Sequence, residues 1–201
     1  KTSYTYSDRG ELASESTYDL AGTPIAVTGR GSQVYTYDNM GNRKTVVATR
    51  PSGDAGGNIT FDFSPSGSPV NALNQYTQRT VPGIFDVAAL STAASVTVDT
   101  ASMAKQGNYF FRGHPLNNAS APVFDSLAVL PAGGTTTNIP GFLPPAAENF
   151  TYDDDGNLLT NGRWTHTYDS ENRLITMETT AAAVTAGTPK QKLVFTYDYL
   201  G

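Results

Sequence analysis

The chain has 201 residues with a formal net charge of −5, and 15% of them are charged, against roughly 25% in typical soluble domains. This acidic, weakly charged composition argues against a nucleic-acid-binding face, and no stretch approaches the ~20 apolar residues of a membrane-spanning helix. The chain has no cysteine, which excludes disulfides and thiolate metal ligands within it but leaves its redox compartment open. Its 19 glycines, 12 prolines and 11 tyrosines favour short strands and turns over helices.

A short motif recurs six times along the chain. Each copy reads Thr-Tyr followed by Asp, or once by Ser7, and three residues later by Gly, or once by Asn172. The motif positions are Tyr6, Gly10, Tyr18, Asp19, Gly22, Tyr37, Asp38, Gly41, Tyr152, Asp153, Gly156, Tyr168, Asp169, Asn172, Tyr197, Asp198 and Gly201. A degenerate relative lies at 60–62. The spacing between copies varies, which indicates a motif carried on hairpins of different length rather than a rigid period.

Each position of the motif has a mechanical role. The residue two before the Tyr is often aromatic, as at Tyr35 and Phe150, so alternation along a strand places both on one face and Thr on the other. The Asp carboxylate accepts the backbone N–H two residues on and opens a turn. Gly or Asn then adopts the left-handed conformation that closes the turn with a bulge. We therefore expect strand, turn and strand in every copy.

One further hairpin is expected at the Asn-Gly pair 161–162, because Asn-Gly between two strand-like runs is the strongest short-range hairpin signal. A two-residue turn at this pair sets Thr160 opposite Arg163 and Leu159 opposite Trp164. Strands chained in this way form a long antiparallel meander.

The motif resembles a known repeat. The Tyr-Asp-x-x-Gly-Asn units, with Tyr-Asp-Ser-Glu-Asn-Arg-Leu at 168–174 and Asn-Ala-Leu-Asn-Gln-Tyr at 71–76, are similar to the YD repeats of bacterial RHS (rearrangement hotspot) proteins. The same repeat occurs in the shells of insecticidal toxin complexes and in teneurins. The resemblance covers roughly 1–76 and 150–201, and six copies make it highly specific.

The resemblance implies a sheet that spirals into a hollow shell. In bacterial members the shell encloses a C-terminal toxin segment, whereas teneurins use it as a rigid extracellular scaffold. By this resemblance the chain is a fragment of a larger, secreted or cell-surface polypeptide, and its partners are the rest of that polypeptide and an encapsulated toxin domain. The family's Asp-bearing self-cleavage segment has no counterpart in the sequence.

Residues 77–149 break the pattern between the two repeat blocks, 1–76 and 150–201. The stretch is rich in Pro, Gly, Ala, Asn and Thr, and its strand-like runs at 94–98, 107–112 and 122–130 are separated by turn residues. Several short strands with turn signals predict a small β-sandwich-like module inserted into one connection of the repeat sheet. The expected fold is therefore all-β: a meander of hairpins in a curved shell, carrying one inserted β-rich module.

No residue is expected to be catalytic, and no metal or cofactor is expected. The run 153–155, near Glu148, has oxygen ligands that suit Ca²⁺, but the repeat places a turn there and the D-x-D-x-D-G spacing is missing. His166 occupies the slot that Tyr or Phe holds in other copies, so packing within a strand is expected of it. His114, in Arg-Gly-His-Pro, is expected to be an exposed turn residue.

Three functions follow from these observations. The leading one is a non-catalytic structural segment of a YD-repeat shell that encloses a toxin or forms a rigid scaffold. The alternative is an extracellular recognition or adhesion module, binding a cell-surface glycan or protein through residues 77–149 or the repeated tyrosines. An enzyme is the third, since a carboxylate pair carries no short signature. Glycosylation sequons occur at Asn58, Asn118 and Asn149.

Overall fold

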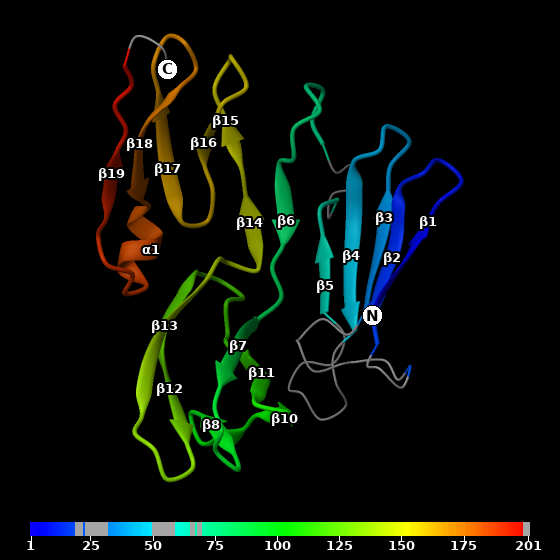
Figure 1. The fold of residues 1–201 in the computed structure, drawn as a ribbon. Helices are drawn as coiled ribbons and strands as arrows, with labels where there is room; N and C mark the ends of the chain where they lie inside the picture. The colour runs from blue at the N-terminus through cyan, green and yellow to red at the C-terminus, as the bar shows by residue number, and fades with distance from the viewer. Residues whose placement is uncertain (19–21, 23–31, 50–58, 65–66, 68–69, 199–201) are drawn as a thin grey trace.

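The computed structural model describes residues 1–18, 22, 32–49, 59–64, 67 and 70–198, which form an all-β fold of small antiparallel sheets, as the sequence predicts. Two five-stranded sheets hold copies of the motif, and two smaller sheets form a module below them in the view of Figure 1. The motif positions Asp19 and Gly201, and the sequon at Asn58, lie outside the described residues.

The first sheet is built from five consecutive strands, each antiparallel to the next. They are β1 (Thr2–Tyr6), β2 (Leu12–Thr17), β3 (Ser32–Tyr37), β4 (Arg43–Thr49) and β5 (Ile59–Asp62). The register of the β1–β2 and β3–β4 pairs shifts at the Thr-Tyr step, which is the bulge that the motif predicts. Aliphatic side chains of β4 and β5 are buried: Val46, Ala48 and Ile59 are 6%, 3% and 8% exposed.

The last sheet repeats this arrangement with five more consecutive strands. They are β15 (Thr151–Tyr152), β16 (Leu158–Thr160), β17 (Trp164–Tyr168), β18 (Leu174–Thr179) and β19 (Lys192–Val194). A short helix, α1 (Ala181–Thr185), joins β18 to β19 and is capped by the Thr180 hydroxyl, which accepts the N–H of Ala183. His166 lies on β17 and is 7% exposed, as expected of a packed strand residue. In the described part of the chain, no helix has the length and apolarity needed to cross a bilayer.

A two-stranded ladder of β6 (Gln78–Thr80) and β14 (Ala147–Asn149) connects the two repeat sheets to the module. Next to it the N–H of Phe150 donates to the Thr77 carbonyl at 2.9 Å, so the two ends of the 77–149 stretch lie side by side. On this ladder Glu148, whose side chain is 4% exposed, pairs with Arg79. The same carboxylate accepts the N–H of Gly162 at 3.0 Å, which attaches the ladder to the β16–β17 hairpin. Satisfying this buried charge from two sides ties the ladder to the last sheet.

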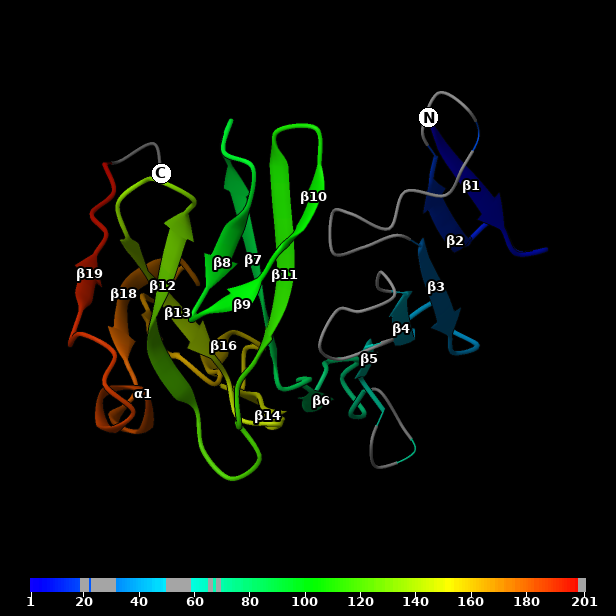
Figure 2. The same cartoon turned by 90° about the horizontal axis from the view of Figure 1, so that it is seen from below.

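The module consists of two sheets packed around one apolar core (Figure 2). One sheet contains β7 (Ile84–Leu90), β10 (Ala104–Gln106) and β11 (Tyr109–Pro115), and the other contains β8 (Val96–Val98), β9 (Ala101–Ser102), β12 (Val123–Pro131) and β13 (Thr137–Leu143). Val87 and Phe110 come from the first sheet, and they meet Val98, Leu127 and Val129 from the second. Alternating inward residues of both sheets thus make a small sandwich.

Asn118 anchors the base of the module. Its side chain is buried, and its amide nitrogen donates to the carbonyls of Val81 at 3.0 Å and Pro144 at 2.8 Å. The backbone of Gly83 lies so close to that of Leu116 that a Cβ built on Gly83 would be 2.6 Å from the Leu116 carbonyl oxygen. The amide of this sequon is therefore engaged inside the protein.

The hairpin predicted at the Asn-Gly pair exists, but the predicted register is wrong because the turn is centred one residue later in the chain. Thr160 lies opposite Thr165, not Arg163, so the central turn residues are Gly162 and Arg163. The cause is the side chain of Asn161, whose oxygen accepts the N–H groups of Arg163 at 2.9 Å and Trp164 at 2.7 Å. This makes Asn161 the first residue of the turn instead of a central one.

The prediction of an exposed turn for His114 is also wrong. The residue lies in β11 opposite Phe85, and its side chain is 15% exposed. Its Nε2 atom is 3.4 Å from the carboxylate of Asp99 on the β8–β9 turn. Pairing of β11 with β7 continues through Pro115, so tertiary contacts override the Gly and Pro signals that flank this histidine.

A core substitution in the module tests this packing. We expect Leu127→Ala to lower the free energy of unfolding by about 2–5 kcal/mol, because it empties a fully buried position between the two sheets. Leu130→Ala, on the same strand but 41% exposed, serves as the matched control and should cost far less. Urea unfolding followed by circular dichroism measures both, and equal losses would contradict this location of the core.

Candidate functional site

Five turns in the described chain share one hydrogen-bond pattern. They begin at Ser7, Asp38, Asn71, Asp153 and Asp169. In each, the first N–H donates to the fifth carbonyl at 2.8–3.0 Å, and the fourth N–H donates to the first carbonyl at 2.9–3.2 Å. The side-chain oxygen of the first residue accepts the third and fifth N–H groups at 2.7–3.3 Å. One acceptor atom thus organises the whole turn.

The fourth residue of each turn has the left-handed backbone that the sequence predicts. Its φ is +78° at Gly10, +89° at Gly41 and +90° at Gly156, and it is +62° and +60° at Asn74 and Asn172. Glycine and asparagine adopt this region at low cost, whereas a β-branched residue would be strained there. The predicted role of Asp as acceptor is confirmed at Asp38, Asp153 and Asp169. The predicted role of Gly or Asn as closing residue is confirmed in all five turns.

The turn at Asn71 lies in the segment 71–76 that shares the resemblance to YD repeats, but it is not among the six motif copies because it has neither the Thr-Tyr pair nor the Asp. The amide oxygen of Asn71 accepts the same two N–H groups that an Asp carboxylate oxygen accepts elsewhere, and the amide nitrogen of Asn71 donates to the Gln75 side chain at 2.8 Å. The sequence signal that could have found it is an Asn followed three residues later by a second Asn, here Asn74. Asparagine can therefore replace aspartate in this turn.

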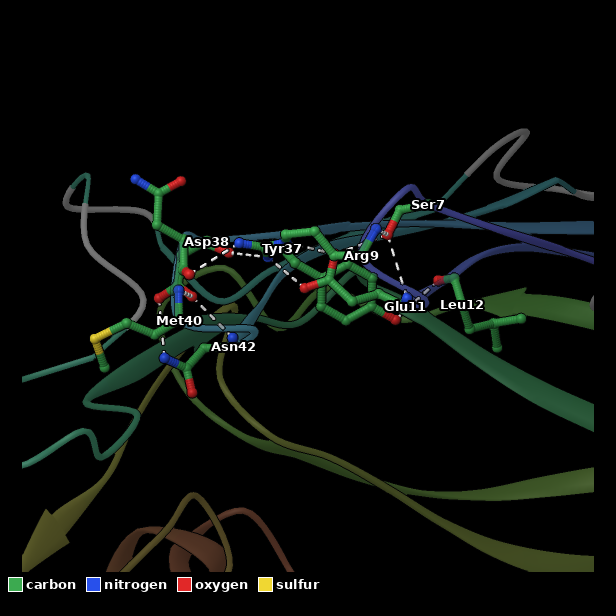
Figure 3. Close-up of polar contacts among 9 residues, drawn as sticks. Ser7, Arg9, Glu11, Leu12, Tyr37, Asp38, Met40 and Asn42 are labelled. Carbon is green, nitrogen blue, oxygen red and sulfur yellow. Dashed lines mark hydrogen bonds and ion pairs between the residues drawn. The ribbon is translucent and has the colours of Figure 1, made fainter.

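Tyrosine hydroxyls connect consecutive turns. In four cases the Tyr of one motif copy donates to the carbonyl of the residue that directly follows the turn before it. The bonds run from Tyr37 to Leu12 at 2.8 Å, Tyr152 to Tyr76 at 2.8 Å, Tyr168 to Leu158 at 3.0 Å and Tyr197 to Leu174 at 2.8 Å. Figure 3 shows the first of these. We call this series of bonds the tyrosine ladder.

The tyrosine ladder also includes the turn that begins at Asn71, which has no tyrosine directly before it. Val70 precedes that turn and has no hydroxyl. Tyr76, which follows the turn, donates instead to the Arg43 carbonyl at 3.1 Å, and its ring lies 5.2 Å from that of Phe63. With this bond the ladder runs without a gap from the first sheet to the last.

Side chains make a second set of contacts between neighbouring turns. The amide of Asn42 donates to the Asn74 side chain at 2.8 Å, and Asn157 makes the same contact with Asn172 at 2.8 Å. In both pairs the fifth residue of one turn reaches the fourth residue of the next. Arg9 joins the first two turns by donating to the carbonyls of Asp38 and Asn39 at 2.6 and 2.8 Å (Figure 3).

Pairs of hydroxyl side chains join the two strands of four hairpins on the opposite strand face. The hydroxyls of Thr36 and Thr45, nine residues apart, lie 2.6 Å from each other across the hairpin. The same spacing recurs in the three other pairs, Thr5–Ser14, Thr151–Thr160 and Thr167–Thr176. Threonine and tyrosine therefore point to opposite faces, as the period of two predicts.

Hydrogen bonding sets the charge state of the turn acids. The Asn42 side chain, with the backbone of the turn, lowers the pKa of the Asp38 carboxyl, and Asn157 does the same for Asp153. At Asp169 the largest contribution to its lowered pKa is the backbone N–H of Arg173. A carboxylate that is ionised at neutral pH, with its oxygens already accepting hydrogen bonds, is a poor general acid.

The remaining chemical candidates do not assemble a site in the described residues. One carboxylate oxygen of Asp153 accepts backbone N–H groups and the other accepts the side-chain amide of Asn157. The carboxylate of Glu148 pairs with Arg79 and accepts the N–H of Gly162. Among the residues that the structure describes, no three His, Asp or Glu side chains are grouped closely enough to hold a metal ion. The structure thus brings the repeat residues together as a continuous row of turns.

Two motif tyrosines differ from the rest. Tyr6 is 64% exposed on the edge strand β1. Tyr18 continues the β1–β2 ladder, where its N–H donates to the Lys1 carbonyl at 2.7 Å.

No family model matches the chain, and a comparison with curated proteins finds no matching relative. The resemblance to YD repeats therefore rests on the sequence motif. Four of the five turns carry a recognised copy of the motif, and the tyrosine that names the motif makes the contact between turns.

A pair of substitutions separates the acceptor role of the turn acid from its charge. Asp153→Ala removes the oxygen that accepts two backbone N–H groups, so we expect a clear loss of thermal stability. Asp153→Asn keeps an acceptor, as Asn71 does in its own turn, and should lose less. Differential scanning calorimetry measures both; an alanine variant as stable as the asparagine variant would contradict the acceptor role.

The lowered pKa values predict how stability depends on pH. Because folding lowers the pKa of Asp38, Asp153 and Asp169, their ionised forms stabilise the fold fully above their unfolded value of about 3.9. This contribution is lost as the pH falls from that value through the lower folded pKa values. The triple Asp→Asn variant should therefore show a shallower decline in urea midpoint below about pH 4 than the parent. Parallel declines would show that these acids are not linked to folding.

Proposed function

We propose that this chain is a non-catalytic structural segment of a YD-repeat β-shell. Its work is to form a continuous wall that encloses a toxin domain of the same polypeptide or serves as a rigid scaffold at the cell surface. The carrying observation is the tyrosine ladder, which joins five turns and the two repeat sheets in one series. A wall needs lateral continuity of this kind, whereas an active site does not.

The geometry at the insertion supports this role. The chain leaves the repeats after Tyr76 and returns at Phe150, yet the Tyr152 hydroxyl bonds the Tyr76 carbonyl as if the two turns were consecutive. A long insertion at a connection costs little closure entropy when its ends are held together. Continuity of the wall is thus independent of what the connection carries.

The repeat residues themselves support a structural role over catalysis. The carboxylates of Asp38, Asp153 and Asp169 bind backbone N–H groups of their own turns. The hydroxyls of four motif tyrosines donate to backbone carbonyls. Groups already satisfied in this way contribute to stability and register rather than to binding a reactant. Secretion or display at the cell surface follows from the family resemblance and belongs to the same proposal.

Removal of one hydroxyl at the junction tests the continuity of the wall. Tyr152→Phe deletes the bond that joins the two series of turns and should destabilise the junction by about 1 kcal/mol. Amide exchange in 71–76 and in the β15–β16 hairpin should then rise on the order of five-fold, measured by mass spectrometry. Tyr109→Phe, 66% exposed in the module, is the control. No increase at the junction would refute the ladder as the joint.

The enclosing role needs a second measurement. Electron microscopy of a longer polypeptide that contains these repeats should show them as the wall of a hollow body. Repeats found in a solid or extended particle would overturn the shell while leaving the ladder intact.

A further inference from the structure

A cavity of about 320 Å³, partly open to solvent, lies beside the turn that begins at Asp38. Its lining combines three aromatic rings with an amide, a guanidinium group and a glycine. These residues are Tyr37, Gly41, Asn42, Arg43, Phe63 and Tyr76. Ligand sites in proteins are clefts of roughly 300–1,000 Å³ with apolar and aromatic walls and a few polar groups. In its size and its lining, this cavity fits a small ligand with one aromatic ring.

The cavity lies at the junction where the repeat departs from its usual pattern. At the other junctions of the tyrosine ladder, a motif tyrosine reaches back to the residue that follows the preceding turn. Here Val70 precedes the next turn, and the Arg43 carbonyl accepts the hydroxyl of Tyr76 at 3.1 Å instead. The cavity therefore occurs where the repeat is one tyrosine ring short.

The aromatic wall is held in place by contacts of its own. The Tyr37 hydroxyl donates to the Leu12 carbonyl at 2.8 Å, and the Tyr76 hydroxyl donates to the Arg43 carbonyl. The ring of Phe63 lies 5.2 Å from that of Tyr76. A wall that is ordered before a ligand arrives lowers the entropic cost of binding.

Arg43 supplies a positive charge at this cavity. The other four turns are followed directly by Leu or Tyr, so an arginine at this place is particular to this junction. Its guanidinium group lies 5.1 Å from the centre of the Tyr35 ring, and among the described residues it forms no ion pair. A guanidinium group binds a carboxylate through two parallel hydrogen bonds.

Asn42 supplies an acceptor nearer the turn. Both hydrogens of its side-chain amide are engaged, by the Asp38 carboxylate at 2.9 Å and by the Asn74 side chain at 2.8 Å. The group that Asn42 offers to a ligand is therefore its amide oxygen, which accepts a hydrogen bond from a hydroxyl. The Arg43 side chain extends away from the turn, toward Tyr35 and a second cavity of about 220 Å³ that it also lines. Acceptor and charge thus lie at different ends of the first cavity.

We propose that this cavity is a binding site for a small hydroxyaryl carboxylate. The ring of the ligand packs against Phe63 and Tyr76, its carboxylate pairs with Arg43, and its hydroxyl donates to the Asn42 oxygen. The site takes up the space of the missing tyrosine ring. It depends on the geometry of one junction and not on the shell, so either proposal can fail alone.

A ligand series tests the chemistry of the site. The probe is p-hydroxycinnamate, and we expect it to bind the full chain with a dissociation constant of about 1 mM or tighter, measured by ligand-observed NMR titration. p-Cresol lacks the carboxylate and should bind on the order of tenfold more weakly. Cinnamate lacks the hydroxyl and should also bind more weakly than the probe.

Two substitutions test the location of the site. Arg43→Gln should weaken p-hydroxycinnamate on the order of tenfold and leave p-cresol unchanged, because only the acid uses the charge. Phe63→Leu removes one ring of the wall and should weaken both ligands. Lys192→Gln is the matched control: it removes one positive charge from the last sheet, at a side chain that is 54% exposed, and should change neither affinity. Thermal unfolding without ligand shows that each variant is folded at the temperature of the titration.

Three results would overturn the proposal. One is the absence of binding of p-hydroxycinnamate at concentrations on the order of 10 mM. Another is equal affinity for p-hydroxycinnamate and p-cresol in the parent chain. The third is an Arg43→Gln variant that is folded and binds the acid as tightly as the Lys192→Gln control.

Discussion

A single side-chain oxygen at the start of each turn is the constraint on which the repeat sheets depend. By accepting two backbone N–H groups, the oxygen of Asp38 or Asn71 closes a five-residue turn and determines where the next strand begins. Because every turn has the same geometry, the residue that follows each one presents its carbonyl at an equivalent place. That carbonyl is the acceptor which the next tyrosine reaches.

The tyrosine ladder converts local turns into a continuous edge. In Figure 1 the repeat turns lie along one side of the molecule, and the module is connected at the opposite ends of β6 and β14. Contacts between turns hold the strands in order along that side, so the connections at the other end are free to vary in length. The variable spacing of the motif and the insertion of a whole sandwich both follow from this division.

Much of this arrangement could be predicted from local patterns. Period two in the Thr-Tyr strands, an acceptor at Asp and a left-handed Gly or Asn are all short-range features, and the structure confirms each. Two local predictions were wrong. At the Asn-Gly pair the side chain of Asn161 accepts the N–H groups of Arg163 and Trp164, which moves the centre of the turn by one residue. At His114 a strand distant in sequence decides the structure, because β7 pairs along the whole of β11.

The amino-acid sequence by itself determined the all-β class and the turn chemistry, because both depend on residues within one or two strands of each other. It also showed that the repeats are interrupted. Only the tertiary structure revealed that Asn71 begins an equivalent turn and that Tyr76 replaces the missing tyrosine. The reason is physical: a hydroxyl bound to a carbonyl 33 or 76 residues away leaves no mark on the local pattern, since it depends on how the hairpins lie side by side.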